Sequence, residues 1–218
     1  MSRHPPHQIA NSVNFEQVSK MEPKPANRFE RRKQRTIAAL KKAALQLVLE
    51  KGYDAVTIQN IVDLADLGRG TFYVHFESKE DIVWQIILDG LMRVNQEGDR
   101  RYKESSYPPG YLGYLLTFEH AAENQDLYRL MMGSQGSALL THRVAQVLAG
   151  QIEASIQSGE YLPDLQQPPE VVAQVIVGAL VRLVLWWLET PNDYRPDQMA
   201  DMIYAIIHGQ ISDTAVQK

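Results

Sequence analysis

The stretch DLGRGTFYVHFESKED, residues 66–81, constrains the fold more than any other part of the chain. Its two glycines, Gly68 and Gly70, interrupt any long helix, because each costs about 0.8–1.0 kcal/mol relative to alanine inside one. Three large apolar residues nevertheless recur at a spacing that places them on one helical face: Leu67, Phe72 and Phe76. We therefore expect a sharp turn made by the glycines, followed by a short helix over residues 71–76.

Helical periodicity continues on both sides of this stretch. Upstream, apolar residues between 37 and 48 recur at helical spacing and stop at Gly52, a typical C-terminal cap. Thr57 then stands as the N-cap of a short amphipathic helix. Downstream, Ser78 and Asp81 form a capping-box variant that begins a longer helix. Two short helices joined by a tight turn and flanked by longer helices are typical of a helix-turn-helix, whose second helix enters the DNA major groove.

Charge is divided unevenly along the chain. The 218 residues carry a net charge of −4, but residues 1–80 hold 13 Lys/Arg and 9 Asp/Glu, whereas residues 81–218 hold 9 and 17. Basic residues are densest in RFERRKQR, residues 28–35, where Glu30 is the only acid. A basic arm beside an acidic body is the pattern of a protein that holds DNA with one end, although a solvated charge run that binds nothing gives the same composition.

The chain contains no cysteine, which excludes disulfides and thiolate metal sites and fits a reducing cytoplasm. Residues 1–27 contain four prolines, show little periodicity and lack the apolar core of a signal peptide, so we expect a disordered tail and no export. An apolar content of 44% suffices for a packed core. The sequence therefore predicts a cytoplasmic, globular protein.

The run TIQNIVDLADLGRGTFYVHFESKEDI, residues 57–82, resembles the DNA-binding region of TetR/AcrR-family (tetracycline-repressor-like) transcriptional regulators. The basic first helix and the lead-in EKGYDAVT match as well, and the resemblance covers residues 31–94 approximately. The chain departs from the family at Asp66 and Gly68, where the family usually has a glycine and a small hydroxyl residue. The resemblance implies an all-α fold in which a helix-turn-helix domain precedes a helical ligand-binding and dimerisation domain.

On this basis we divide the chain into a tail over residues 1–27, a DNA-binding domain over 28–93 and a regulatory and dimerisation domain over 94–218. Eight residues are expected to contact double-stranded DNA: Arg35, Thr57, Arg69, Gly70, Thr71, Tyr73, His75 and Lys79.

The expected roles of these residues differ. Thr57 and Lys79 open helices and are expected to hold phosphates. Tyr73 and His75 resemble the family's backbone-contacting aromatic residue and histidine. Arg69 and Thr71 are the candidates for base edges, and Gly70 permits close approach of its helix. Arg35 either follows the DNA backbone or reaches a minor groove, and the sequence does not choose between the two.

The remainder of the chain reads as successive helices, and residues 171–188 are apolar on nearly every face. This segment is long enough to cross a membrane, but Arg182 and Gln174 lie inside it, so a buried interface helix is favoured and no membrane partner is expected. A second apolar stripe runs through residues 199–211. The two segments predict a four-helix interface between two copies of the chain, and such a homodimer reads a palindromic operator with recognition helices about 34 Å apart, or a multiple of that distance.

Regulators of this family usually respond to a small molecule, so the resemblance also implies an apolar effector. The candidate ligand residues are aromatic, methionine or basic: Tyr114, Phe118, Tyr128, Met131, Arg182, Trp186 and Trp187. Aromatic and methionine residues at helical spacing form a core more often than a pocket, and that alternative stays open.

Catalytic signatures are missing from the sequence. It contains neither HExxH nor G-x-S-x-G, and GRG is neither a Walker A loop nor a dinucleotide fingerprint. We therefore expect no enzyme, no cofactor and no metal, with a helical enzyme as the weak alternative. The most favoured function is a ligand-responsive repressor, and an activator or constitutive regulator of the same fold is the alternative, because the fold does not encode the sign of regulation.

Overall fold

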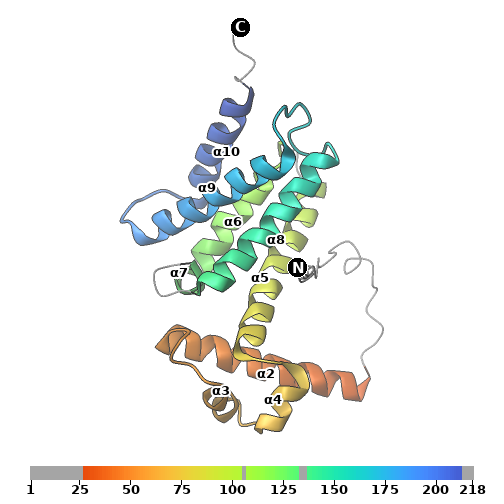
Figure 1. Ribbon diagram of the computed structural model, residues 1–218, viewed down its shortest axis with the longest axis vertical. Helices are drawn as coiled ribbons and strands as arrows, with labels where there is room; N and C mark the ends of the chain where they lie inside the picture. The colour runs from red at the N-terminus through yellow and green to blue at the C-terminus, as the bar shows by residue number, and fades with distance from the viewer. Residues whose placement is uncertain (1–26, 105–106, 133–136, 213–218) are drawn as a thin grey trace, which may run out of the picture. The chain divides into compact units, whose positions relative to one another are not determined.

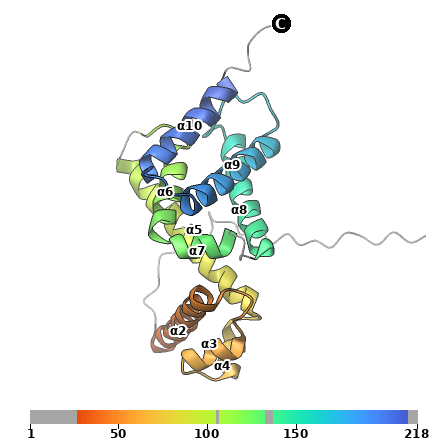
Figure 2. The same ribbon diagram turned by 90° about the vertical axis from the view of Figure 1, so that its left-hand side faces the viewer.

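The computed structural model describes residues 27–104, 107–132 and 137–212, and every regular element in these ranges is an α-helix (Figures 1 and 2). The expected all-α fold is confirmed. The predicted tail lies outside the described residues except for Asn27. The helices are α2 (Arg28–Lys51), α3 (Ile58–Leu64), α4 (Arg69–His75), α5 (Lys79–Glu104), α6 (Tyr111–Glu123), α7 (Gln125–Met132), α8 (Ala138–Gln157), α9 (Pro169–Glu189) and α10 (Pro196–Ser212).

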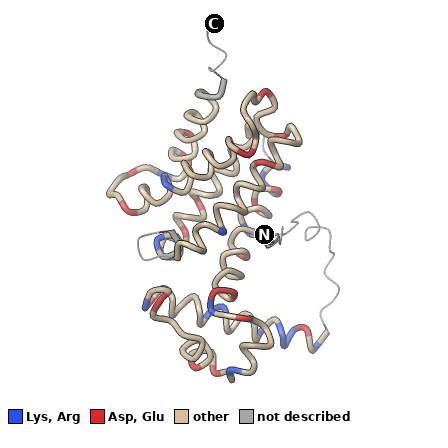
Figure 3. Tube along the Cα trace, viewed as in Figure 1, with Lys and Arg blue, Asp and Glu red and all other residues tan. Residues whose placement is uncertain are grey.

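The described chain forms two units, which divide between Ala38 and Ala39 within α2. The first unit holds the opening turns of α2, over which Lys and Arg residues gather (Figure 3). The second unit holds the rest of α2 and the helices α3–α10. The boundary at residues 93 and 94 between a DNA-binding and a regulatory domain stays a prediction.

The caps expected at the start of the helix-turn-helix region are present. α2 ends at Lys51, and Gly52 has a φ of +80°, the left-handed conformation that glycine adopts without strain. Thr57 is the N-cap of α3 and forms a reciprocal capping box with Asn60, whose backbone N–H donates to the Thr57 hydroxyl at 3.2 Å. Together these caps fix where α2 ends and α3 begins.

The turn between α3 and α4 differs from the expectation that its glycines would make it. Asp66 has the left-handed φ of 53°, whereas Gly68 has a φ of −82° and is the N-cap of α4. The backbone N–H of Leu67 donates to the carbonyl of Val62 at 2.9 Å, and that of Asp66 donates to Asp63 at 3.3 Å. These two bonds form a Schellman motif, in which Asp66 takes the position that glycine usually fills.

A consequence is that α4 begins at Arg69, two residues earlier than the sequence predicts, so that Gly70 lies within the helix. After α4, the Ser78 hydroxyl accepts a hydrogen bond from the backbone N–H of Asp81 at 3.1 Å. The expected start of α5 after Ser78 is therefore confirmed.

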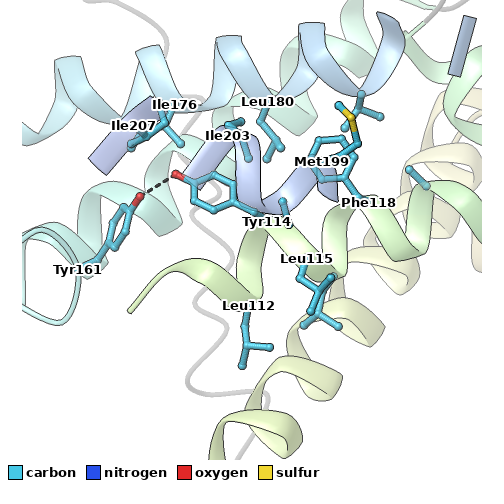
Figure 4. Close-up of a cluster of buried hydrophobic side chains, with 14 of the residues drawn as sticks. Leu112, Tyr114, Leu115, Phe118, Tyr161, Ile176, Leu180, Met199, Ile203 and Ile207 are labelled. Carbon is cyan, nitrogen blue, oxygen red and sulfur yellow. Dashed lines mark hydrogen bonds between the residues drawn. The ribbon is translucent and has the colours of Figure 1, made fainter. Parts of the chain in front are cut away.

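The main core of the second unit is built by α6, α9, α10 and the loop that precedes α9. α10 packs against α6, and α8 lies beside α9 (Figures 1 and 2). Figure 4 shows Tyr114 of α6 and Tyr161 of the loop pointing toward each other, with hydroxyl oxygens 2.7 Å apart. Phe118, Met199 and Ile203 fill the space between α6 and α10 in the same view. Their packing holds α6 and α10 at a fixed separation.

α9 is not covered on every face by its own chain. Its buried face packs against α8, α7 and α6, while Val171, Val175 and Arg182 lie on the opposite, exposed face. By length and composition alone, α9 is the described helix that would cross a membrane. Its packing is that of a core helix with one face left uncovered.

The apolar stripe predicted on α10 separates into two faces. Met199, Ile203 and Ile207 are buried in the core of their own chain, whereas Met202 and Ile206 are exposed. The expectation that all five residues share one interface stripe is wrong, because they form two adjacent rows of spacing four, and the core of the same chain covers the row 199, 203 and 207 but not the row 202 and 206.

Candidate functional sites

α4 has one face in the core and one face toward solvent. Phe72 and Phe76 are buried and anchor the helix, as the sequence predicts. Tyr73 is 52% exposed, and its ring meets that of Phe72 edge to face, with centroids 5.5 Å apart. Arg69 and Gly70 are exposed, and Thr71 and His75 are half-buried. The helix therefore presents polar groups on a surface supported by aromatic packing.

The first residue of α5 is held by the loop that follows α2. Lys79 donates a hydrogen bond from Nζ to the backbone carbonyl of Tyr53 at 2.9 Å and lies 4.2 Å from the centre of the Tyr53 ring. The Tyr53 hydroxyl donates to Glu80 Oε1 at 2.8 Å. Burial and the neighbouring Glu80 carboxylate raise the pKa of Tyr53, so the phenol stays protonated. The ammonium group is thus fixed at the start of α5.

The structure marks two further predicted DNA contacts, Thr57 and Arg35, less clearly. The Thr57 hydroxyl takes part in the capping box and donates to Asn60 at 2.8 Å, so its bonds are made within the chain. Arg35 is an exposed residue of α2 and belongs to the first unit. The DNA contacts of all eight predicted residues stay predictions.

A cavity of about 250 Å³ lies among α5, α6, α7, α8 and α9. Its wall is mainly apolar and includes Ile87, Leu91, Val94, Leu127, Val144, Leu148, Ile152, Leu180, Val181 and Val184. The polar residues of the wall come from separate elements: Asn95, Thr117, His120, Gln151 and Ser155, with Tyr114, Tyr128 and Tyr161. An apolar enclosure with a few convergent polar groups is typical of a small-molecule site.

His120 is the one histidine in the wall of this cavity. Its Nδ1 lies 2.9 Å from the Tyr128 hydroxyl, and a Cβ added at Gly90 would lie 3.6 Å from its Nε2. Burial lowers the pKa of His120, and the nearby charge of Arg93 lowers it further. The imidazole is therefore neutral near pH 7 and offers one donor or acceptor to the cavity.

The structure brings together only part of the predicted ligand set. Tyr114 and Tyr128 line the cavity. Phe118 packs instead against Trp187, with ring centroids 5.5 Å apart, and the Trp187 Nε1 donates to the carbonyl of Tyr194 at 2.8 Å. Arg182 and Trp186 also stand outside the cavity wall. The side chain of Met131 lies outside the described residues.

Sequence reasoning missed the contributions of α5 and α8 to the cavity. A signal was available in α5, where Gly90 interrupts an otherwise regular helical pattern, because a glycine inside a helix usually has a packing or functional reason. Gly113 in α6 gives a similar signal, and both glycines line the cavity. In the part of the chain that the structure describes, no three His, Asp or Glu side chains are grouped so that they could hold a metal ion.

α9 and α10 also carry a pair of exposed apolar faces. Val175 of α9 is 60% exposed and Ile206 of α10 is 59% exposed. On α9 the exposed face includes two small residues, Gly178 and Ala179, and a Cβ added at Gly178 would meet no atom within 4 Å. Large exposed aliphatic residues beside small ones form a surface on which another helix can pack closely.

Comparison with known proteins agrees with both parts of the chain. The family model for bacterial regulatory proteins of the tetR family matches residues 40–86, and the model for a transcriptional regulator C-terminal region matches residues 111–209. The chain is 22% identical over 169 residues to the fatty acid metabolism regulator protein of Bacillus subtilis, an alignment that covers 72% of this chain and 85% of that protein.

Solved structures show the same fold. The TetR transcriptional regulator of Streptococcus agalactiae matches with a TM-score of 0.64 and 21% identity, over 82% of this chain and 97% of that one. The transcriptional regulator FadR of Bacillus subtilis, in complex with stearoyl-CoA, matches with a TM-score of 0.59 and 20% identity, over 78% and 96% of the two chains. With a helix-turn-helix at residues 57–76 and matching family models over both parts, the chain belongs to the tetR family of DNA-binding transcriptional regulators.

Proposed function

We propose that the protein is a ligand-responsive repressor, which binds a palindromic operator as a homodimer and releases it when a largely apolar effector fills the cavity among α5–α9. The observation that carries this proposal is the cavity itself, whose mainly apolar wall is contributed by five helices. Burial of apolar surface stabilises a bound ligand by about 25 cal/mol per Å², so such a wall favours an apolar molecule.

The stearoyl-CoA complex of the structurally similar FadR supports an effector with a long apolar part. The effector must also bind the two states of the repressor with different affinity. Moving a population from 1:99 to 99:1 requires about 5.5 kcal/mol of preference for the released state. By reciprocity, operator DNA then weakens effector binding by the same factor.

The exposed faces of α9 and α10 support the homodimer. Val175 and Ile206 are large aliphatic residues left in contact with water by the single chain, and Gly178 leaves room for a partner helix. Covering both faces with the same helices of a second copy gives an isologous four-helix interface. A two-fold axis through that interface places two copies of α4 on two half-sites of a palindrome.

The test begins with DNA selected by the purified protein from a random-sequence library, and fluorescence anisotropy then gives the affinity for the selected operator. Candidate apolar compounds are screened for those that weaken operator binding. In Leu148→Trp the larger ring is expected to fill the cavity, so that this variant binds the operator but no longer responds to the effector.

The matched control is Leu139→Trp, the same substitution at an exposed position of α8 outside the cavity wall. This control is expected to respond as the wild type does. A Leu148→Trp protein that keeps its fold and responds to the effector at wild-type concentrations would place the effector elsewhere.

A further inference from the structure

A charged groove adjoins the cavity. It is formed by α5, α6 and the residue after α6, and two residues, Val94 and His120, line both the groove and the cavity. The groove carries six charged side chains: Arg93, Arg100, Arg101, Glu97, Glu119 and Glu123. The apolar cavity and the ionic groove therefore share part of their walls, which we call the junction.

Most of the groove's charges are already paired. Arg101 donates to Glu97 from Nε at 2.8 Å and pairs with Glu119 from Nη1 at 2.8 Å. Arg100 pairs with Glu97 and with Glu104. These bonds hold the pKa of Glu97 down at about 2. The two arginines are thus committed to carboxylates of their own chain.

Arg93 is the exception among these arginines, because it makes no ion pair or hydrogen bond with any residue that the structure describes. It lines the groove together with His120, and its charge lowers the pKa of that residue. The carboxylate of Glu123 raises the pKa of His120, by less than the charge of Arg93 lowers it. Arg93 and Glu123 are thus the two charged residues of the groove that make no ion pair with the described residues, and Arg93 is the cation of the two.

The two polar atoms of the His120 ring have different surroundings. Nδ1 is engaged by the Tyr128 hydroxyl at 2.9 Å, which fixes the ring orientation. Nε2 has no hydrogen-bond partner among the described residues and faces Gly90, where the absence of a side chain leaves space. The junction thus presents a neutral polar atom just inside the cavity and a cation just outside it.

We propose that the effector is an amphipathic anion, whose apolar chain fills the cavity and whose anionic group passes His120 to pair with Arg93 in the groove. The inference rests on the proposed function, which places the effector in the cavity, and adds the chemical class of the molecule. A carboxylate of a free fatty acid and the phosphates of an acyl thioester share this chemistry, because both present an anionic oxygen to a guanidinium group.

The test is isothermal titration of the full-length protein with three ligands that carry the same ten-carbon chain: decanoate, decanoyl-CoA and decanol. Without a cation at the junction, the carboxylate would bind more weakly than the alcohol, because its charge loses water without compensation. A preference for the anions therefore reports on Arg93. We expect wild-type protein to bind at least one anion about tenfold more tightly than decanol, a difference of about 1.4 kcal/mol.

Arg93→Gln is expected to lose this preference while its affinity for decanol stays within about twofold of wild type. The matched control is Lys103→Gln, which removes one positive charge from the same helix at an exposed residue that lines neither the groove nor the cavity. This control is expected to behave as the wild type does. Tight binding of decanoate assigns a carboxylate head group, and tight binding of decanoyl-CoA alone assigns a phosphate head group.

The possible failures are distinguishable. Equal affinity of wild-type protein for all three ligands, or an anion preference that survives in Arg93→Gln, overturns the amphipathic-anion proposal and leaves the apolar effector of the proposed function standing. Absence of binding of all three ligands contradicts both proposals, since none of the three chains would then enter the cavity.

Discussion

Lys79 and Tyr53 are joined twice, by a hydrogen bond of 2.9 Å from the ammonium to the Tyr53 carbonyl and by the position of that ammonium 4.2 Å from the centre of the Tyr53 ring. An ammonium has three N–H donors, so two remain for an outside acceptor. The contact therefore fixes the side chain in advance and would reduce the entropy lost in the predicted contact with a phosphate.

Lys79→Gln is expected to weaken binding to every DNA sequence to the same extent. The magnitude of the slope of log K against log salt concentration is expected to fall by about 0.9, the value for one phosphate contact on B-DNA. Anisotropy titrations at several salt concentrations measure both effects. Lys103→Gln, which changes the same charge at an exposed position of α5, is the control, and equal slopes for the two variants would remove Lys79 from the DNA surface.

Arg69→Ala is expected to act differently, because a side chain that touches base edges contributes to discrimination. Loss of one good base contact costs about 1–3 kcal/mol of discrimination between cognate and mismatched operators. The measurement is the ratio of affinities for the selected operator and for single-base variants of it. A uniform loss of affinity with an unchanged ratio would assign Arg69 to the phosphates.

Charge substitutions on α10 are expected to separate dimerisation from folding. Ile206 is 59% exposed in the single chain, so Ile206→Glu is expected to leave a folded monomer that no longer binds the palindrome tightly. Ile203 is 2% exposed in the core, and Ile203→Glu is expected to unfold the chain, because a buried carboxylate has no partner there. Analytical ultracentrifugation and circular dichroism distinguish the two results. A dimeric Ile206→Glu protein would move the interface away from this face.

Two glycines that line the cavity are expected to respond to alanine with opposite signs. A Cβ at Gly90 would lie 3.5 Å from His120, an ordinary contact, so Gly90→Ala is expected to raise the free energy of unfolding by about 0.8–1.0 kcal/mol. Gly110 has a φ of +78°, and a Cβ there would overlap the Tyr161 ring. Gly110→Ala is therefore expected to lower the free energy of unfolding by about 1–3 kcal/mol. Urea unfolding at one protein concentration measures both.

Stability is expected to fall when the pH drops below about 6.5, the ordinary pKa of histidine in an unfolded chain. Burial lowers the pKa values of His120 and His208, so the unfolded state binds more protons than the folded state below that pH. The melting temperature of wild-type protein should therefore decrease between pH 7.5 and pH 5.5. His120→Gln should show a shallower decrease, and parallel curves for the two proteins would contradict a half-buried imidazole with a lowered pKa.

The helix-turn-helix is predictable from the sequence because its signals are local. Gly52, Thr57 and Ser78 each cap a helix through bonds to residues within four positions, and all three caps occur where expected. The prediction for the turn itself is wrong, because Asp66 and not a glycine is left-handed there. Asp66 adopts the left-handed conformation because α3 ends at Leu64 in a Schellman motif, and the identity of one residue does not fix where a short helix ends.

The cavity was not predictable to the same degree. A sequence pattern shows which side chains fill a core, whereas a cavity is formed where side chains do not meet. The aromatic residues Trp186 and Trp187 are predicted to line it, but the Trp187 ring packs against Phe118 and both tryptophans lie outside the cavity wall. The two faces of α10 were likewise inseparable, because Ile203 and Ile206 are equally apolar and only the packing of α6 distinguishes them.

α5 is continuous from Lys79 to Glu104, so the turn that begins at Lys79 and the turn that contains Gly90 belong to one helix, which we treat as a rigid rod. Eleven residues at 1.5 Å each separate these two positions by about 16 Å along the axis. If a ligand against Gly90 tilted this rod by about 5°, the Lys79 end would sweep about 1.4 Å, half the length of a hydrogen bond. α5 can therefore act as a lever that converts a small displacement at the cavity into a larger one at Lys79, the residue predicted to contact a phosphate.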